Sequence, residues 1–314
     1  MKPEILVLGG VWSQEVRAQV EAAFHCHFMA AIPVAGDPAF AAIAGGIRAV
    51  MTTGTVGVTP DLVASLPALE IVSVHGVGID AVPLALLARQ GIHVTNTPDV
   101  LTDDVADFAV TLLLSTVRRL PQLDRYVRDG GWAARGPLSH ARSLNGKVAG
   151  IVGFGRIGQA VARRLQGFGM AIRYFQRSAG PAPAQRSGSL LALAAQSDVL
   201  VLCMPGGADT RHMIDAQVLE ALGPEGTLVN IARGSVVDEA ALVAALQDGR
   251  LGAAGLDVFE DEPNVPAALC ALDNVVLTPH VGSFTLEARR AMGRLAVANL
   301  VAHFDGEPLP TPVV

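Results

Sequence analysis

The chain has 314 residues, of which 51% are hydrophobic and 17% are charged, and its formal net charge is −6 at pH 7. This hydrophobic content excludes an intrinsically disordered chain, and the negative charge argues against general attraction to nucleic acid or to anionic membranes. The length allows two domains, because a single hydrophobic core rarely grows to this size.

The three cysteines, Cys26, Cys203 and Cys270, are scattered through the chain. They show neither the spacing of metal ligands nor a disulfide framework, which is typical of a reducing compartment. The apolar part of residues 1–10 is too short for a signal peptide, and no run of about 18 apolar residues predicts a transmembrane helix. We therefore expect a cytoplasmic protein with no metal and no membrane partner.

Short apolar runs alternate with helical segments in the N-terminal part of the chain. We expect a helix at about 13–24 and strands at 5–8, 49–52, 71–74 and 92–95. This alternation predicts a first parallel α/β unit. A long amphipathic helix at about 102–118 follows, with Thr102 as its N-cap and two aspartates in its first turn, and we interpret it as the connection between domains.

A second alternating unit begins at Val148. Its expected strands lie at about 148–152, 171–175, 199–203, 227–231, 253–256 and 275–278. These six strands complete one doubly wound sheet, so the last helix, at about 284–303, has no sheet of its own left to cover. We therefore assign it, with the tail to Val314, to the first domain. Its expected apolar stripe is Phe284, Ala288, Ala291, Leu295, Ala298 and Ala302.

The segment 148–158, VAGIVGFGRIG, carries a glycine motif between a buried strand and a helix. In G-x-G-x-x-G, Gly153 allows the tight turn, Gly155 lets a pyrophosphate approach the backbone, and Gly158 lets the helix pack close to the strand. The backbone N–H groups at the helix start then face the phosphates. We expect residues 153–158 (Gly153, Phe154, Gly155, Arg156, Ile157 and Gly158) to bind a dinucleotide.

The end of the second strand of this unit indicates which dinucleotide binds. A site for NAD has an acidic residue there that accepts a hydrogen bond from the ribose 2′-hydroxyl, but no Asp or Glu occurs between Asp129 and Asp198. Arg177 and Ser178 stand where a 2′-phosphate would lie, and a guanidinium binds phosphate well. The sequence therefore favours NADP(H) over NAD(H), unless Arg177 is an ordinary solvated loop residue.

An arginine, a carboxylate and a histidine follow three expected strands of the second unit. Arg233 is suited to bind the carboxylate of a 2-keto acid, and His280 to donate a proton to its carbonyl oxygen. Glu262 beside the histidine would favour the imidazolium. Taken singly, each has a simpler interpretation as a surface ion pair, a structural histidine or part of a solvated acidic run. Their combination downstream of a dinucleotide motif favours the catalytic interpretation.

These segments also carry a family resemblance. The chain resembles the D-2-hydroxyacid dehydrogenases, and within them the NADPH-dependent glyoxylate/hydroxypyruvate reductases and the related hydroxyphenylpyruvate reductases. The matching motifs are GVGID (76–80), TNTPDVLTDDVAD (95–107), GFGRIG (153–158), LVNIARGSVVDEAAL (228–242), GAAGLDVFEDEP (252–263) and LTPHVGS (277–283).

The resemblance implies an α/β fold with two doubly wound, Rossmann-like domains, parallel sheets and an active site in the cleft between them. Residues 1–98 plus 283–314 would form a flavodoxin-like substrate-binding domain, and residues 99–282 an NADP-binding domain. It also implies a homodimer. The expected reaction is the reduction of glyoxylate to glycolate and of hydroxypyruvate to D-glycerate with NADPH.

The resemblance assigns roles to individual residues. Arg233, Glu262 and His280 are the catalytic residues, and Arg233 and His280 also bind substrate, together with Val77, Gly78, Ser283 and Trp132. Trp132 matches a tryptophan that reaches the partner subunit's active site in some relatives, and its alternative role is dimer packing. Besides the glycine motif, the expected cofactor contacts are Gln176, Arg177, Ser178, Cys203, Met204, Pro205, Thr210, Ile231, Ala232, Asp257, His280 and Gly282.

The sequence departs from the family pattern at one loop, and several alternative functions stay open. Gly206 and Gly207 stand where relatives often carry a threonine, so the coenzyme contact of that loop rests on Thr210. The nearest alternative substrate is 4-hydroxyphenylpyruvate. A phosphoglycerate dehydrogenase, or a dinucleotide-sensing, corepressor-like binding protein on the same fold, are further alternatives.

Overall fold

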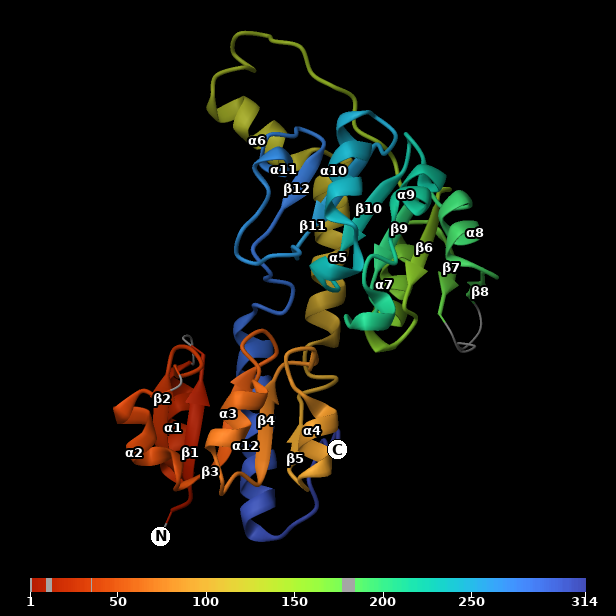
Figure 1. The fold of residues 1–314 in the computed structure, drawn as a ribbon. Helices are drawn as coiled ribbons and strands as arrows, with labels where there is room; N and C mark the ends of the chain where they lie inside the picture. Colours follow the sequence, from red (N-terminus) through yellow and green to blue (C-terminus); the bar gives the residue numbers. More distant parts are fainter. Residues whose placement is uncertain (1, 10–12, 35, 177–183) are drawn as a thin grey trace. The chain divides into compact units, whose positions relative to one another are not determined.

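The computed structural model describes residues 2–9, 13–34, 36–176 and 184–314. The chain forms two compact units, the first from residues 1–101 and 284–314 and the second from residues 102–283 (Figure 1). The expected boundaries, at 98/99 and 282/283, lie beside these. Within the described ranges, no helix is long and apolar enough to cross a membrane.

A parallel five-stranded sheet forms the centre of the first unit, with strand order β2-β1-β3-β4-β5. The strands are β1 (Glu4–Leu8), β2 (His25–Met29), β3 (Ile47–Thr53), β4 (Ile71–His75) and β5 (His93–Thr95). Strands β1 and β4 are buried on both faces because helices cover both sides, as is usual for parallel sheets.

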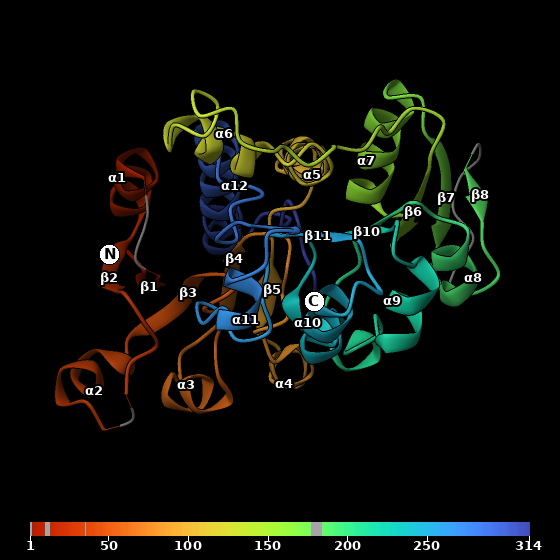
Figure 2. The same cartoon turned by 90° about the horizontal axis from the view of Figure 1, so that it is seen from above.

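Helices lie on both faces of this sheet (Figure 2). They are α1 (Gln14–Ala23), α2 (Pro38–Ala44), α3 (Pro60–Ser65), α4 (Leu84–Arg89) and α12 (Leu286–Asp305). One face packs against α1 and α12, and the other against α2, α3 and α4. The last helix thus covers the first sheet, and the Ser73 hydroxyl of β4 donates a hydrogen bond to the Ala296 carbonyl of α12.

Two details of this unit differ from the sequence prediction. Strand β2 was not expected, because its sequence HCHFM shows no apolar run. The buried face of α12 consists of Ala288, Met292, Gly293, Ala296, Val297, Asn299 and Leu300, so the expected stripe was wrong except at Ala288. A Cβ atom on Gly293 would come within 2.0 Å of the Val16 side chain. Glycine at this position therefore lets α1 pack closely against this face of α12.

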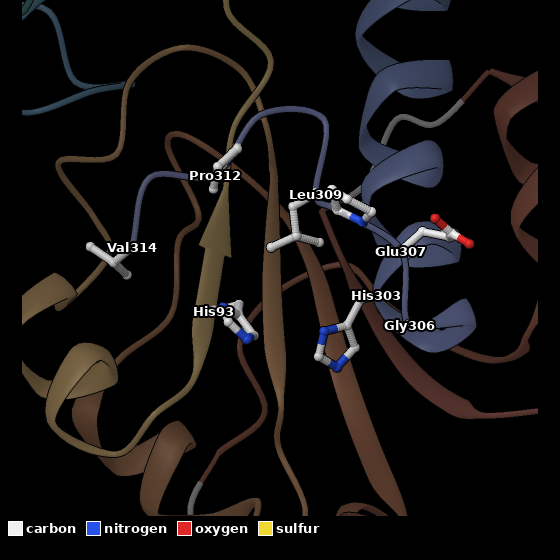
Figure 3. A pocket seen from close by; sticks show the side chains of 8 residues that line it. His93, His303, Gly306, Glu307, Leu309, Pro312 and Val314 are labelled. Atoms are coloured by element: carbon white, nitrogen blue, oxygen red, sulfur yellow. The ribbon is translucent and has the colours of Figure 1, made fainter.

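The C-terminal tail covers the β5 edge of the sheet. The N–H of Val94 donates to the Val314 carbonyl, and the N–H of Val313 donates to the Val94 carbonyl. This pairing protects an otherwise open edge strand. Beside it lies a cavity of about 590 Å³ into which His93 and His303 point (Figure 3). None of the predicted site residues lines this cavity.

The second unit contains a parallel seven-stranded sheet with strand order β12-β11-β10-β9-β6-β7-β8. Its strands are β6 (Val148–Val152), β7 (Ala171–Phe175), β8 (Gln185–Arg186), β9 (Val199–Leu202), β10 (Thr227–Asn230), β11 (Ala253–Leu256) and β12 (Val275–Leu277). The expected six are present, and the two-residue β8 is added at one edge. The strand order reverses between β6 and β9, which is where open α/β sheets bind ligands.

Helices cover both faces of this sheet as well (Figure 2). The elements are α5 (Thr102–Val117), α6 (Leu120–Arg128), α7 (Arg156–Gly167), α8 (Leu190–Ala195), α9 (Ala216–Leu222), α10 (Glu239–Gln247) and α11 (Ala267–Cys270), with 3₁₀ turns at Ala208–Thr210 and Gly234–Val236. Helix α5 packs on α7, β10 and β11, whereas α8 to α11 contribute to the core on the opposite face.

Candidate active site

The glycine motif forms the turn between β6 and α7. Gly153 has φ +88°, and a Cβ atom there would lie 2.7 Å from the Met204 nitrogen, so both the backbone angle and the close approach require glycine. A Cβ atom on Gly158 would lie 2.1 Å from the Gly153 carbonyl oxygen. These two contacts bring the start of α7 against the strand, as the motif predicts.

Gly155 differs from these two glycines, because a Cβ atom there would meet no described atom within 4 Å. It is the N-cap of α7, and no side chain caps this helix end. The exposed N–H groups at a helix start attract phosphate. The turn therefore has the open space and the donors that a pyrophosphate needs, and it fits a dinucleotide.

The end of β7 supports this turn. The Gln176 side-chain oxygen accepts a hydrogen bond of 3.1 Å from the Phe154 N–H, and the Phe154 ring stacks on Tyr174 at 4.3 Å. Arg177 and Ser178 lie outside the described residues. Arg186 on β8, which the sequence prediction did not include, donates a hydrogen bond of 3.0 Å to the Gln176 carbonyl. A second arginine thus lies beside the position expected for a 2′-phosphate.

The loop after β9 lies against the glycine turn. The N–H of Cys203 donates to the Val152 carbonyl at 2.8 Å, and burial raises the pKa of the Cys203 thiol to about 12, which keeps it neutral. The Thr210 hydroxyl donates to the Pro205 carbonyl at 2.9 Å. This bond closes the loop on itself despite Gly206 and Gly207, so the hydroxyl stabilises the loop.

Arg233 follows β10 in a closely packed turn. The Asn230 side chain accepts from the Ala232 N–H at 3.0 Å and donates to the Arg233 carbonyl at 2.9 Å. A Cβ atom on Gly234 would lie 1.9 Å from the Phe259 carbonyl carbon, so this turn presses against the loop after β11. The packing fixes the main chain that carries the Arg233 guanidinium.

Asp257, directly after β11, holds the loop that contains His280. One carboxylate oxygen accepts from the Thr278 hydroxyl at 2.7 Å and from the Val281 N–H at 2.9 Å, and the other accepts from the Gly282 N–H at 2.8 Å. The residue is 2% exposed. Burial raises the pKa of Asp257, while these hydrogen bonds oppose the rise. Its carboxylate therefore positions this loop, a role that its place beside a strand end did not reveal.

His280 and Glu262 form the expected pair. Nδ1 of His280 lies 2.8 Å from Oε2 of Glu262, and Oε1 of Glu262 accepts from the Phe259 N–H at 3.1 Å. Burial acts to raise the pKa of Glu262, but the hydrogen bond and charge of His280, with smaller contributions from the Phe259 N–H and from Arg233, lower it overall. An ionised Glu262 therefore lies against Nδ1 of His280 and orients its ring.

The remaining predicted contacts are distributed over both units. Ile231, Ala232 and Met204 are buried beside the ends of β10 and β9. In the first unit, Val77 and Gly78 follow β4, and the Asn96 side chain donates to the Val77 carbonyl at 2.9 Å. Trp132 lies in an irregular segment of the second unit and is 71% exposed, and Ser283 is the last residue of that unit.

The second unit thus combines a glycine turn that fits a dinucleotide, at the switch point of a doubly wound sheet, with an arginine and a histidine–carboxylate pair at neighbouring strand ends. This combination defines the class of dinucleotide-dependent dehydrogenases. Residues 110–282 match the family described as D-isomer specific 2-hydroxyacid dehydrogenase, NAD binding domain. The chain belongs to the D-isomer specific 2-hydroxyacid dehydrogenase family.

Within this family, the chain is similar to several individual reductases. The chain is 52% identical over 272 residues to hydroxyphenylpyruvate reductase from Plectranthus scutellarioides, covering 86% of this chain and 87% of the relative. It is 50% identical over 269 residues to glyoxylate/hydroxypyruvate reductase A of Arabidopsis thaliana, covering 85% and 86%. The structure resembles NADPH-dependent glyoxylate/hydroxypyruvate reductase from Sinorhizobium meliloti in complex with NADP and malonate, with a TM-score of 0.94 and 42% identity, covering 100% and 97%.

Proposed function

We propose that this protein reduces small 2-keto acids, with glyoxylate and hydroxypyruvate as the main substrates and NADPH as the electron donor. The observation that carries this proposal is the 2.8 Å pair of His280 and Glu262, placed by the Asp257-bound loop near the charge of Arg233. A proton donor, a carboxylate that orients it and a cation for the substrate carboxylate are what carbonyl reduction of a keto acid needs.

Each residue has one part in this reaction. The nicotinamide, when bound, supplies a hydride to the carbonyl carbon. The Arg233 guanidinium binds the substrate carboxylate. Nε2 of the His280 imidazolium donates its proton to the carbonyl oxygen, and Glu262 stabilises the positive charge before the transfer. Asp257 keeps His280 in place.

The preference for NADPH is supported by charge. The end of β7 has no acidic residue that would bind a 2′-hydroxyl or repel a 2′-phosphate, and it has Arg186 beside Gln176 as well as Arg177 in the sequence. Guanidinium groups bind phosphate with paired hydrogen bonds. We expect Arg186→Gln to raise the KM for NADPH more than the KM for NADH.

A homodimer is supported by apolar side chains exposed on one segment of the second unit. Leu120, Val127, Trp132 and Leu138 are 59%, 53%, 71% and 56% exposed, and α6 buries none of its residues within this chain. Exposed apolar groups of this kind mark interfaces. Light scattering should give the mass of two chains, and Trp132→Ser should weaken the dimer while Phe168→Ser, an exposed aromatic elsewhere, should not.

The reduced cysteines support a cytoplasmic location.

The test of the proposed activity is the initial rate of NADPH oxidation with glyoxylate, hydroxypyruvate and 4-hydroxyphenylpyruvate, repeated with NADH. Faster turnover of the two small acids with NADPH would support the proposal. Fast turnover of the aromatic acid alone would keep the chemistry and make this chain a hydroxyphenylpyruvate reductase, which its 52% identity to such an enzyme supports as the second candidate. Saturable coenzyme binding without turnover would contradict both.

A further inference from the structure

Two histidines and a glutamate come together at the β2 edge of the first sheet, outside every residue assigned above. His25 and His27 are two positions apart on β2, so their side chains lie on one face of the strand. In the parallel register, Glu4 of β1 pairs with His25. The imidazoles stack with ring centroids 5.1 Å apart. One ligand atom from each of the three residues lies within 4.8 Å of the other two.

The contact between His27 and Glu4 is not a hydrogen bond. Nε2 of His27 is buried and makes no hydrogen bond to any described residue, although Oε2 of Glu4 is 3.4 Å away. Two ligand atoms on one tetrahedral zinc, each about 2.0–2.1 Å from the metal, are about 3.4 Å apart. The separation therefore suits a shared metal ion, which would satisfy the buried nitrogen.

The surroundings favour these three ligands over others. Cys26 lies between the histidines but points to the opposite face, where it packs against the core with α1 and α12. Within the described part of the chain, no lysine or arginine forms an ion pair with the Glu4 carboxylate, whose near contact is the His27 ring.

We propose that Glu4, His25 and His27 bind one divalent transition-metal ion of the zinc class, with water completing its coordination. Two imidazoles and a carboxylate suit zinc, nickel or copper, whereas magnesium and calcium prefer oxygen ligands. His25 is exposed, so its ring is able to turn toward a metal that reaches the site from solvent. The ion would link the edge strand β2 to β1 and so stabilise the first unit. The site is independent of the proposed catalytic reaction.

The test is calorimetric titration of the chelator-treated full chain with Zn²⁺, and separately with Mg²⁺. We expect one equivalent of Zn²⁺ to bind, a zinc-dependent rise in Tm, and neither effect with Mg²⁺. His27→Gln and Glu4→Gln should each weaken zinc binding about tenfold or more, by analogy with the loss of groups that support metal sites. His93→Gln, another exposed histidine of the same unit, is the matched control and should bind zinc as the parent does.

A pair of neighbouring glycines gives a second test that keeps all three ligands. A Cβ atom on Gly46 would lie 2.8 Å from Oε2 of Glu4, whereas one on Gly45 would meet nothing within 4 Å. Gly46→Ala should therefore displace the carboxylate and weaken zinc binding, and Gly45→Ala should not. Equal zinc affinity in the parent and in His27→Gln, or no saturable binding by the folded parent, would overturn the proposal. Circular dichroism shows whether each variant is folded.

Discussion

The loops at 211–212 and 280–282 both place a histidine against a glutamate of the same acidic run. Nε2 of His212 lies 2.9 Å from Glu260, and Nδ1 of His280 lies 2.8 Å from Glu262. Both histidines also have positive φ, +50° and +54°. Distance and backbone conformation therefore do not distinguish the two pairs.

The surroundings of the two histidine–glutamate pairs differ. Glu260 also binds Arg211 at 2.5 Å, so its charge is already balanced by a guanidinium at the surface. Glu262 has the Phe259 N–H and the nearby charge of Arg233 instead, and the main chain around His280 is held by the buried Asp257 carboxylate. The proposed function assigns proton transfer to His280 rather than to His212, because its loop is held in place and Arg233 lies near its carboxylate partner.

The largest expected effect is that of His280→Asn. Asparagine tolerates positive φ, so the loop is retained while the proton donor is lost. We expect kcat/KM for glyoxylate reduction to fall about 10³-fold, within the range for general acid catalysis. His212→Asn is the matched control and should change it less than about threefold, because His212 has no part in the proposed reaction and Glu260 keeps its ion pair with Arg211. Similar losses in both variants would mean that the two pairs are not functionally different.

Asp257→Asn tests whether the hydrogen bonds from Asp257 to the His280 loop account for the functional difference between the two histidine–glutamate pairs. The Asn amide NH₂ would face a backbone N–H of Val281 or Gly282, leaving a buried donor without an acceptor, which costs roughly 1–3 kcal/mol. We expect kcat to fall about 100-fold, with a smaller change in the KM for NADPH, as measured by steady-state kinetics. Unchanged kcat would show that His280 does not need these hydrogen bonds.

A third histidine, His75, shows how burial changes the pKa of an imidazole. His75, at the end of β4, is 5% exposed, and burial, together with the charge of Arg289, lowers its pKa to about 4. The unfolded chain, with an ordinary histidine pKa of about 6.5, binds this proton earlier, so stability is lost as pH falls from about 6.5 toward 4.

Urea unfolding at pH 7 and pH 4.5 measures this loss. The His75 contribution should be about 2–3 kcal/mol, and His75→Gln, whose amide is able to donate to the Arg289 carbonyl, should reduce the pH dependence by that amount. His93→Gln, at an exposed histidine, should leave it as in the parent. An equal slope in the His75→Gln variant would contradict a neutral, buried His75.

The sequence predicted the parts of this molecule that depend on local pattern. The glycine turn and the parallel α/β fold follow from local motifs and alternation, whereas the pairing of Glu262 with His280 was implied by the family resemblance. Strand β2 was missed because its histidines give no apolar signal, and the face of α12 was wrong because an alanine-rich helix has small residues on several sides. The role of Asp257 depends on the backbone N–H groups of another loop, and these leave no trace in the sequence.

The smallest expected difference is that between Glu262→Gln and Glu260→Gln, which change only the charge of each glutamate. Glutamine keeps a hydrogen-bond acceptor for either histidine but removes the charge. At Glu262 the substitution removes the charged partner that orients the ring of His280, so kcat for reduction should fall about tenfold. At Glu260 kcat should not change, because His212 has no part in the proposed proton transfer. Steady-state kinetics measures both values. An equal fall in both variants would mean that the whole acidic run supports His280 and that the direct contact with Glu262 has no separate effect.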